Sequence, residues 1–228
     1  MMKKGSINAI AQLPDLIPLP PSDLRMETIE EGGQTRHRLR FSQAIGNIGR
    51  GPLQVRRVDS SRACPGKGKA AGYQTIFFSD GSTKSIRMKQ CMVYHPVHKH
   101  WHIAHMANYD LCRVHPYTGG IGDTVAATDK VSFCVGDEFR LDQRYYQGPS
   151  YEKRYRSCKR KIFGLTPGWA EDYDYSVYGQ WIDVTDVPDG IYYLRVTVNP
   201  DEVFQEETRS NNVIWRRIQI YNNRRNVI

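Results

Sequence analysis

Apolar side chains recur at every second position along several stretches of the 228-residue chain. They do so at 192–198, and the short stretch 38–41 alternates in the same way. This period is typical of a β-strand with one buried face, because residues i and i+2 of a strand face the same side. The stretches 180–187 and 213–221 are rich in β-branched and aromatic residues, which strands favour. Sustained helical periodicity is missing, so we expect a mainly β protein with an antiparallel β-sandwich core, long functional loops and little helix.

Turn and loop signals separate these strands. The Pro-Asp-Gly sequence at 188–190 predicts a turn that joins 180–187 to 192–198 as a hairpin. The stretches 61–88 and 136–172 keep no period. Loops of that length are either functional or disordered.

Length and hydropathy suit one globular domain. The chain is 39% hydrophobic and has no apolar run near 18 residues, so we expect no membrane span. The Pro-rich stretch 14–21 is the only plausible linker. The first residues include two lysines but lack an uninterrupted apolar segment, so the chain as given shows no secretory signal.

The charge balance is basic. Lys and Arg number 32 against 24 Asp and Glu, a formal net charge of +8. The excess is concentrated in blocks such as 153–161, which favours anionic partners. Tyr145, Tyr146, Tyr151 and Tyr155 stand in or near this block and could stack on bases. No recognised nucleic-acid-binding module accompanies them, so we expect a solvated basic loop and no nucleic-acid partner.

Five of the seven histidines lie between His95 and His105. His98, His100 and His102 are spaced i, i+2, i+4, so on a strand they would face one side with successive Cα atoms about 6–7 Å apart. Three converging imidazoles with an open position make a metal site of the catalytic style, although copper, zinc, iron and nickel all suit imidazole. A metal-free histidine cluster is the alternative, but its rings would repel one another when charged. His105 has the opposite parity and points to the other face unless a bulge returns it.

The five cysteines, at positions 64, 91, 112, 134 and 158, contain no C-x-x-C pair. This excludes a zinc ribbon and a thioredoxin motif. One or two disulfides remain open, and at least one thiol is left over.

Six short motifs, in order and in spacing, resemble the catalytic domain of the lysyl oxidase family. They are H-K-H-W-H (98–102), N-Y-D-L (108–111), D-K-V-S-F-C (129–134), G-L-T-P-G (164–168), Q-W-I-D-V-T-D-V (180–187), and V-N-P with S-N-N (198–200 and 210–212). The resemblance covers about residues 35–221. It predicts an N-terminal extension with the first strand region at 1–34, the catalytic domain at 35–221 and a tail at 222–228.

The resemblance implies a copper-dependent amine oxidase with a lysine tyrosylquinone, a cofactor made from the protein's own side chains. The family's three copper ligands correspond to His98, His100 and His102. Its cross-linked pair corresponds to Lys130, before S-F-C, and to Tyr173, which both the G-L-T-P-G and Q-W motifs locate. Such an enzyme oxidises peptidyl lysine or small primary amines to aldehydes with O₂, and releases H₂O₂ and ammonium.

The chain departs from the family pattern near the catalytic base. The family has a histidine immediately before Y-D-L, where this chain has Asn108. The base is therefore open, with His105 and Asp110 as candidates. The usual partners of Cys134 and Cys158 are also missing, so these two pair with each other or Cys158 pairs with Cys91.

A second resemblance concerns calcium. Family members hold Ca²⁺ between an Asp-Leu pair and an acidic loop, which resemble Asp15 with Leu16, and Glu206 with Asn211 and Asn212. Oxygen ligands of this mix suit a hard cation. Thr208 replaces one family carboxylate, and a turn capped by Asn side chains is the alternative.

Two hypotheses from different classes follow. The first is a primary-amine oxidase, and the second is a copper-binding β-sandwich without turnover. Copper loading and disulfides favour an extracellular or periplasmic location, which is an expectation from the family.

Overall fold

The structure is a computed structural model that describes residues 9–59, 62–128 and 131–228. Every regular element in this part of the chain is a β-strand. We therefore find there no helix that is long and apolar enough to cross a bilayer. The expected mainly β class is confirmed.

The described residues form strands of two to fifteen residues. In chain order these are β1 (Ala11–Gln12), β2 (Leu16–Pro18), β3 (Ser22–Glu31), β4 (Gln34–Asn47), β5 (Leu53–Val58), β6 (Lys69–Phe78), β7 (Thr83–His95), β8 (His100–Val114), β9 (Ile121–Ala127), β10 (Val131–Phe133), β11 (Phe139–Arg140), β12 (Ile162–Leu165), β13 (Trp169–Tyr173), β14 (Trp181–Asp183), β15 (Gly190–Val198), β16 (Val213–Tyr221) and β17 (Asn226–Val227).

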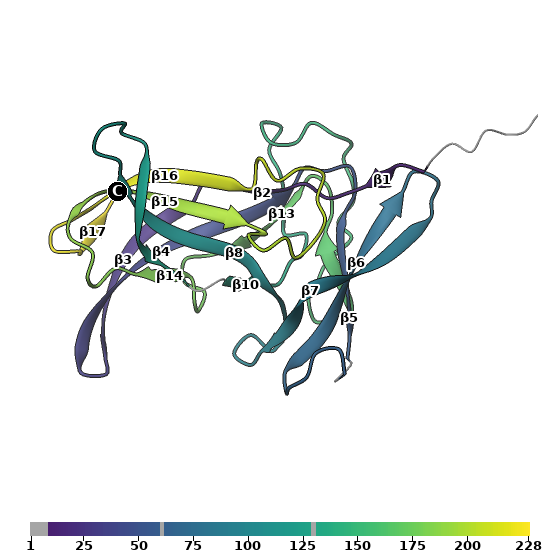
Figure 1. Ribbon diagram of the computed structural model, residues 1–228, viewed down its shortest axis with the longest axis horizontal. Helices are drawn as coiled ribbons and strands as arrows, with labels where there is room; N and C mark the ends of the chain where they lie inside the picture. The colour runs from purple at the N-terminus through teal and green to yellow at the C-terminus, as the bar shows by residue number, and fades with distance from the viewer. Residues whose placement is uncertain (1–8, 60–61, 129–130) are drawn as a thin grey trace, which may run out of the picture.

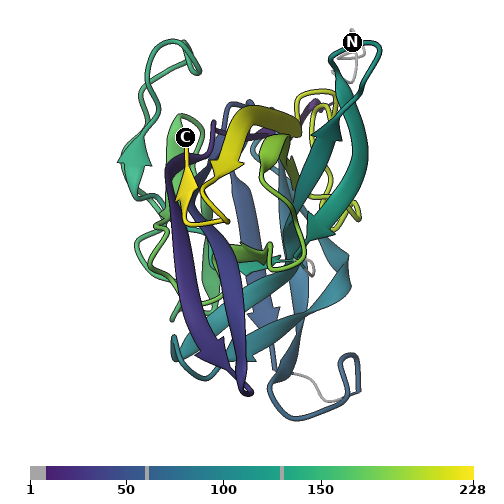
Figure 2. The ribbon, with the colours of Figure 1, turned by 90° about the vertical axis from the view of Figure 1, so that its left-hand side faces the viewer.

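The strands form two antiparallel sheets. The larger has the order β12-β5-β6-β7-β8-β15-β16-β17, with β1 beside β6 and both β9 and β10 beside β8. The smaller has the order β11-β13-β4-β14, with β2 and β3 also paired to β4. The long strand β8 crosses the molecule in Figure 1, starting beside β7 and ending between β15 and β9. Figure 2 brings the β3–β4 hairpin of the smaller sheet to the front.

The core lies where the two sheets face each other. Phe41 of β4 meets Tyr109 of β8 edge to face, with ring centroids 4.9 Å apart. Both rings are fully buried, as are Leu39 on β4 and Leu111 on β8. Burial of such side chains is the main stabilising contribution to a fold of this kind. The same packing fixes β8 and β4 relative to each other. The candidate site lies on β8 and on β13, which pairs with β4.

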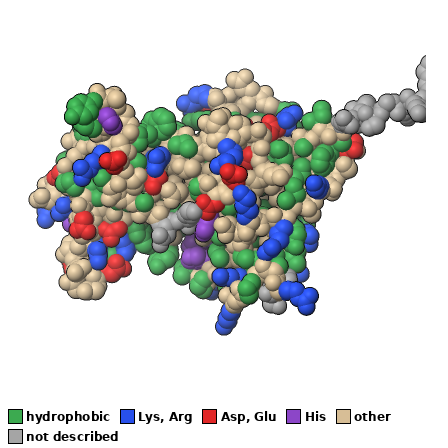
Figure 3. Space-filling model, in the orientation of Figure 1, with side chains coloured by type: hydrophobic (Ala, Val, Ile, Leu, Met, Phe, Trp, Pro, Cys, Tyr) green, Lys and Arg blue, Asp and Glu red, His purple; other side chains and the backbone are tan. Residues whose placement is uncertain are grey.

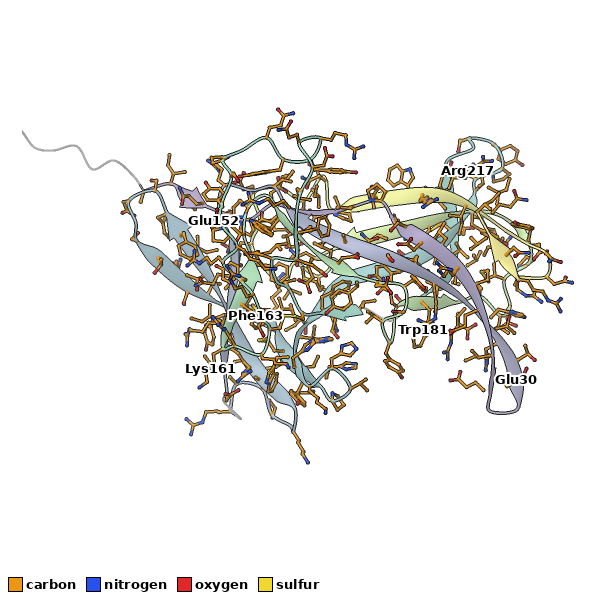
Figure 4. All side chains as sticks on the ribbon, turned by 180° about the vertical axis from the view of Figure 1, so that it is seen from behind. Glu30, Glu152, Lys161, Phe163, Trp181 and Arg217 are labelled. Atoms are coloured by element: carbon orange, nitrogen blue, oxygen red, sulfur yellow. A yellow bond between two sulfur atoms is a disulfide. The ribbon has the colours of Figure 1, made fainter. Side chains whose placement is uncertain are left out.

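The expected hairpin between 180–187 and 192–198 is wrong. Trp181–Asp183 forms β14 in the smaller sheet and pairs with β4, whereas β15 pairs with β8 and β16 in the larger sheet. The Pro-Asp-Gly turn therefore lies on a crossing between sheets. A turn signal is local, so it cannot specify which strand becomes the partner. The Trp181 side chain is labelled in Figure 4. The guanidinium of Arg38 lies over its ring, 4.3 Å from the centroid.

The two long unpatterned stretches are shorter loops than expected. Residues 69–78 form β6, and residues 83–88 belong to β7. The sequence did not predict β6 because its buried face includes small residues, which a search for alternating hydrophobic side chains does not detect. A Cβ on Gly72, for example, would lie 2.6 Å from the Met88 sulfur. The second stretch contains β11, β12 and β13, with the fully buried Phe163 on β12 (Figure 4).

The Pro-rich start of the described chain is part of the core rather than a linker. Leu16–Pro18 pairs with β4, and Leu16 is fully buried. The residual loop 141–161 contains the basic block, and its Tyr155 is buried, so that ring is not free to stack on a base.

Two disulfides link the described cysteines. Cys64 bonds to Cys91 on β7, and Cys134 after β10 bonds to Cys158. Pairing of Cys134 with Cys158 was one of the two expected alternatives, and pairing of Cys158 with Cys91 is wrong. Cys112 is the left-over thiol, buried on β8.

Candidate active site

The histidine cluster stands on the β7–β8 hairpin. His95 ends β7 and pairs with His100, the first residue of β8, while His98 lies in the turn between them. The expectation of one strand face is therefore wrong for His98. Lys99 takes a left-handed conformation with φ of +56°, and this turn returns the chain so that His98 still meets the other two.

The three predicted ligands converge. His102 Nε2 lies 3.0 Å from His100 Nε2 and 3.3 Å from His98 Nδ1. One ring nitrogen from each residue lies within 4.8 Å of the others, and no other group of three His, Cys, Asp or Glu residues in the described chain converges in this way. Histidine side chains reach the surface near the middle of the face in Figure 3.

The imidazoles are held in the form that binds metals. His102 is buried, and its Nδ1 lies 3.1 Å from the Ser132 carbonyl oxygen, so an Nδ1–H donated there leaves the Nε2 lone pair facing the other rings. Burial, followed by the neighbouring imidazoles, lowers the pKa of His102 to about 3. Burial also lowers the pKa of His98 and of His100. Neutral nitrogens aimed at one point fit a metal such as copper.

A fourth imidazole belongs to the cluster. The His95 ring stacks on His98 with centroids 4.2 Å apart and lies 5.0 Å from the His102 ring. Its Nδ1 accepts the His98 backbone N–H at 3.4 Å. His95 therefore supports the turn that carries His98.

Tyr173 comes to the cluster from the other sheet. It ends β13, opposite Gln43 of β4, and its ring is buried with its centroid 4.0 Å from that of Phe133 on β10. Its oxygen accepts the Cys134 backbone N–H at 2.7 Å. Burial raises the pKa of the Tyr173 hydroxyl, so the unmodified side chain is neutral near pH 7.

The G-L-T-P-G motif explains why Tyr173 lies where it does. Asp137 accepts hydrogen bonds from both the backbone N–H and the hydroxyl of Thr166, each at 2.7 Å. Gly168 has φ of +78°, which glycine adopts without strain, and its N–H donates to the Asn47 carbonyl at 2.8 Å. The motif therefore builds the β12–β13 turn and sets the start of the strand that ends at Tyr173.

Two hollows border Tyr173. The first, of about 180 Å³, is lined by His95, His98, His102, Val131, Ser132, Tyr173, Tyr178, Gly179 and Gln180. The second, of about 420 Å³, is lined by His98, His100, Cys134, Glu138, Glu171, Asp172, Tyr173 and Val177. Lys130 lies outside the described residues, and its described neighbour Val131 lines the first hollow. Tyr173 and His98 therefore border both open spaces, with His102 on the first and His100 on the second.

The two candidate bases are engaged elsewhere. His105 takes a positive φ of 56°, and its Nδ1 lies 2.7 Å from Asp201. Asp110 accepts hydrogen bonds from Arg195 Nε and Asn108 Nδ2, each at 3.0 Å. Neither residue lines the two hollows beside Tyr173.

The second hollow instead has an acidic wall of Glu138, Glu171 and Asp172. Burial, followed by the charge of Glu138, raises the pKa of Glu171 to about 8. The residue type was visible in the sequence, but 136–172 had no strand period to place it. Had β13 been recognised, the spacing of 171 and 173 would have put both on one face.

The five predicted calcium residues also come together. The Asp15 carboxylate accepts a hydrogen bond from Asn211 Nδ2 at 3.0 Å. The Glu206 carboxylate accepts from the Leu16 backbone N–H at 2.8 Å and from Asn212 Nδ2 at 2.9 Å. Burial raises the pKa of both acids. The amide oxygens of Asn211 and Asn212 are buried with no hydrogen-bond partner among the described residues, which suits an oxygen-seeking cation.

Comparison with known proteins adds an independent line of evidence. Residues 74–228 match the family model described as lysyl oxidase. The chain is 35% identical over 122 residues to protein-lysine 6-oxidase of Gallus gallus, covering 53% of this chain and 26% of that protein. It is 33% identical over 132 residues to lysyl oxidase homolog 1 of Homo sapiens, covering 56% and 20%. For protein-lysine 6-oxidase of Sus scrofa the identity is 34% over 122 residues, covering 53% and 44%.

The matched segments span less than half the length of each of these relatives. The family match, by contrast, covers more than half of this chain and contains the histidine cluster, Tyr173 and both hollows. The chain therefore belongs to the lysyl oxidase family.

Proposed function

We propose that this protein is a copper-dependent amine oxidase that converts primary amines, either peptidyl lysine or small amines, to aldehydes with O₂, releasing H₂O₂ and ammonium. The observation that carries the proposal is that Tyr173 and His98 border both hollows, while His102 borders the first and His100 the second. Family membership supports the same reaction class.

The roles of the residues follow from their surroundings. His98, His100 and His102 would hold copper, since burial keeps their nitrogens neutral and Ser132 fixes the orientation of His102. Lys130 and Tyr173 would provide the lysine tyrosylquinone. With copper bound, the quinone would supply a reactive carbonyl and a two-electron acceptor, which ordinary side chains lack. The Cys134 N–H holds the Tyr173 oxygen beside the hollows.

We also propose a calcium site and a location outside the cytoplasm. Asp15, Leu16, Glu206, Asn211 and Asn212 would bind Ca²⁺, supported by the two unpartnered amide oxygens. Two disulfides suit an oxidising compartment, so we place the protein outside the cell or in a periplasm.

Amine-dependent peroxide release tests the proposal. The copper-loaded protein is mixed with a primary amine, and H₂O₂ is measured for the wild type, Tyr173→Phe and Tyr178→Phe. Tyr178 is the matched control because it lines the first hollow but is exposed. We expect release from the wild type and Tyr178→Phe and at least a 1000-fold loss in Tyr173→Phe. Copper binding by the wild type without any amine-dependent peroxide would support a copper-binding protein without turnover.

A further inference from the structure

Glu171 is a carboxylate on the wall of the second hollow, which Tyr173 also lines. It precedes Tyr173 by two residues on β13, so the two side chains face the same side, and both line that hollow. Its carboxylate accepts a hydrogen bond from the Gly136 backbone N–H. A Cβ on Gly136 would lie 3.2 Å from Glu171 Oε2, so the carboxylate packs directly over that glycine. Glu171 is thus held in a defined position.

The proposed reaction requires a group that accepts a proton from the substrate amine. A primary alkylamine reaches the protein as an ammonium ion, since its pKa is near that of lysine, about 10.4. An ammonium nitrogen has no free electron pair and cannot attack a carbonyl carbon. One of its protons must therefore be removed inside the site before the amine can react.

We propose that Glu171 binds the substrate ammonium in the second hollow and accepts one of its protons, so that the neutral amine is formed beside Tyr173. In this step one N–H bond breaks, its electron pair stays on nitrogen, and the proton joins a carboxylate oxygen of Glu171. Nothing is oxidised or reduced. The inference rests on the proposed function and assigns a catalytic residue to it.

The surroundings of Glu171 make it a suitable proton acceptor. An ordinary glutamate is a weaker base than an alkylamine by about six powers of ten, so it would hold the proton too briefly. Burial and Glu138 raise the pKa of Glu171 to about 8, which narrows this gap to about two powers of ten. A base whose pKa lies near the working pH is also the most efficient.

The charges around Glu171 come from three parts of the fold. Asp137 and Glu138 on the preceding segment raise its pKa, and Lys153 from the long loop lowers it. The same loop places Arg156 and Lys159 beside Lys153 on a neighbouring hollow that Glu171 also lines. Across the second hollow stand His98 and His100, and on its own strand Asp172 and Tyr173 line the same space. Glu138 is the alternative proton acceptor on this wall, but its carboxylate accepts the Asp172 backbone N–H at 3.0 Å and so holds β13 in place.

Amine binding to the metal-free protein tests Glu171 without any turnover. The affinity for n-butylamine is measured by calorimetry between pH 6 and pH 9. We expect it to rise at least tenfold as Glu171 ionises around pH 8, because the carboxylate attracts the ammonium. Glu171→Gln should lose the rise. Glu138→Gln should keep it but move it to lower pH, since a charge that opposes ionisation of Glu171 is gone. An unchanged pH rise in Glu171→Gln overturns the inference.

A second measurement uses the wild type alone. The Glu171 carboxyl carbon is followed by NMR in the metal-free protein, with and without saturating n-butylamine. A bound ammonium favours the charged carboxylate, so its titration should shift to lower pH. A titration that ignores the amine contradicts the proposal.

The copper-loaded enzyme separates this inference from the proposed function. Reaction with phenylhydrazine reports whether the quinone carbonyl exists, whatever residue accepts the proton. If the wild type forms no adduct, the proposed function fails, and the metal-free binding experiments still judge Glu171. If the adduct forms equally in the wild type and Glu171→Gln, the two enzymes are compared by kcat/KM. We expect the variant to lose the rise of kcat/KM on the acidic side of the pH profile. We also expect its kcat/KM at pH 8 to be at least 100-fold below that of the wild type. A variant that retains both rules out the role of Glu171.

Discussion

The four imidazoles of the cluster differ in what they do. His98, His100 and His102 direct one nitrogen each to a common point, whereas His95 stacks on two of them and accepts a backbone N–H. A ligand supplies a bond to the metal, and a stacked neighbour only supports its position. Substitution should therefore distinguish the three from the fourth.

Copper affinity makes that distinction measurable. We expect alanine at position 98, 100 or 102 to weaken copper binding by more than 100-fold, and His95→Ala by about tenfold, the lower range seen for supporting residues. Competition with a chelator of known affinity gives the values. Equal losses at all four positions would mean that His95 is also a ligand.

Glu171 carries a cost in stability that follows from its burial. Its folded pKa is raised to about 8 from an ordinary value of 4.5, so between these values the folded state binds more protons than the unfolded state. The free energy of unfolding should therefore fall as pH rises from 4.5 to 8, by up to about 1.4 kcal/mol per pH unit from this residue. Glu171→Gln should remove that slope in urea unfolding of the metal-free protein. A variant with the wild-type slope would show that the carboxyl titrates normally.

At the scale of elements, the sequence predicts the type of structure better than its pairing. The alternation at 192–198 correctly predicts a strand in β15, because that period follows directly from one buried face. The partner of β14 is not predictable from the Pro-Asp-Gly turn, since pairing with β4 depends on the packing of the two sheets. The histidine set was predictable from residue type, but its convergence comes from a turn at Lys99 that an alternating pattern conceals.

The Cys134–Cys158 disulfide links two elements, because it joins the end of β10 to the loop 141–161. Cys134 also donates its backbone N–H to the Tyr173 oxygen, whereas the Cys64–Cys91 disulfide has no such contact. The two bonds close loops of similar length, with separations of 24 and 27 residues. Removing either pair as a double Cys→Ala variant should therefore lower the unfolding free energy by about 3 kcal/mol.

Only the Cys134 pair should also alter the site. We expect that double variant to form less quinone, measured as phenylhydrazine adduct per copper, while the Cys64 and Cys91 variant forms the wild-type amount. The opposite order would show that the backbone at Cys134 is not needed to place Tyr173.

The proposed calcium ligands join the start of β2 to the segment before β16. Binding of Ca²⁺ to the folded state alone stabilises it by mass action. Millimolar Ca²⁺ should therefore raise the Tm, and Asp15→Asn should abolish the increase because one carboxylate is lost. Asp80→Asn, an exposed control, should leave it intact. Equal responses of wild type and Asp15→Asn would exclude calcium at these residues.

At the scale of the whole molecule, the site exists because two sheets meet. The imidazoles come from the larger sheet and Tyr173 from the smaller one, with β10 between them. Sequence motifs could identify these residues through the family resemblance, but periodicity alone could not, since no local pattern says that Tyr173 of β13 packs on Phe133 of β10. The acidic wall at Glu171 shows the same limit, because its meaning appears only when the hollow is known.

We propose above all that Lys130 and Tyr173 become one cofactor in the presence of copper. Proteolytic peptide mapping of the copper-loaded protein by mass spectrometry tests it most directly, with protein kept copper-free as the control. We predict a single cross-linked pair of peptides, one containing Lys130 and the other Tyr173, only in the loaded sample. Two separate, unmodified peptides from fully loaded protein would contradict the account.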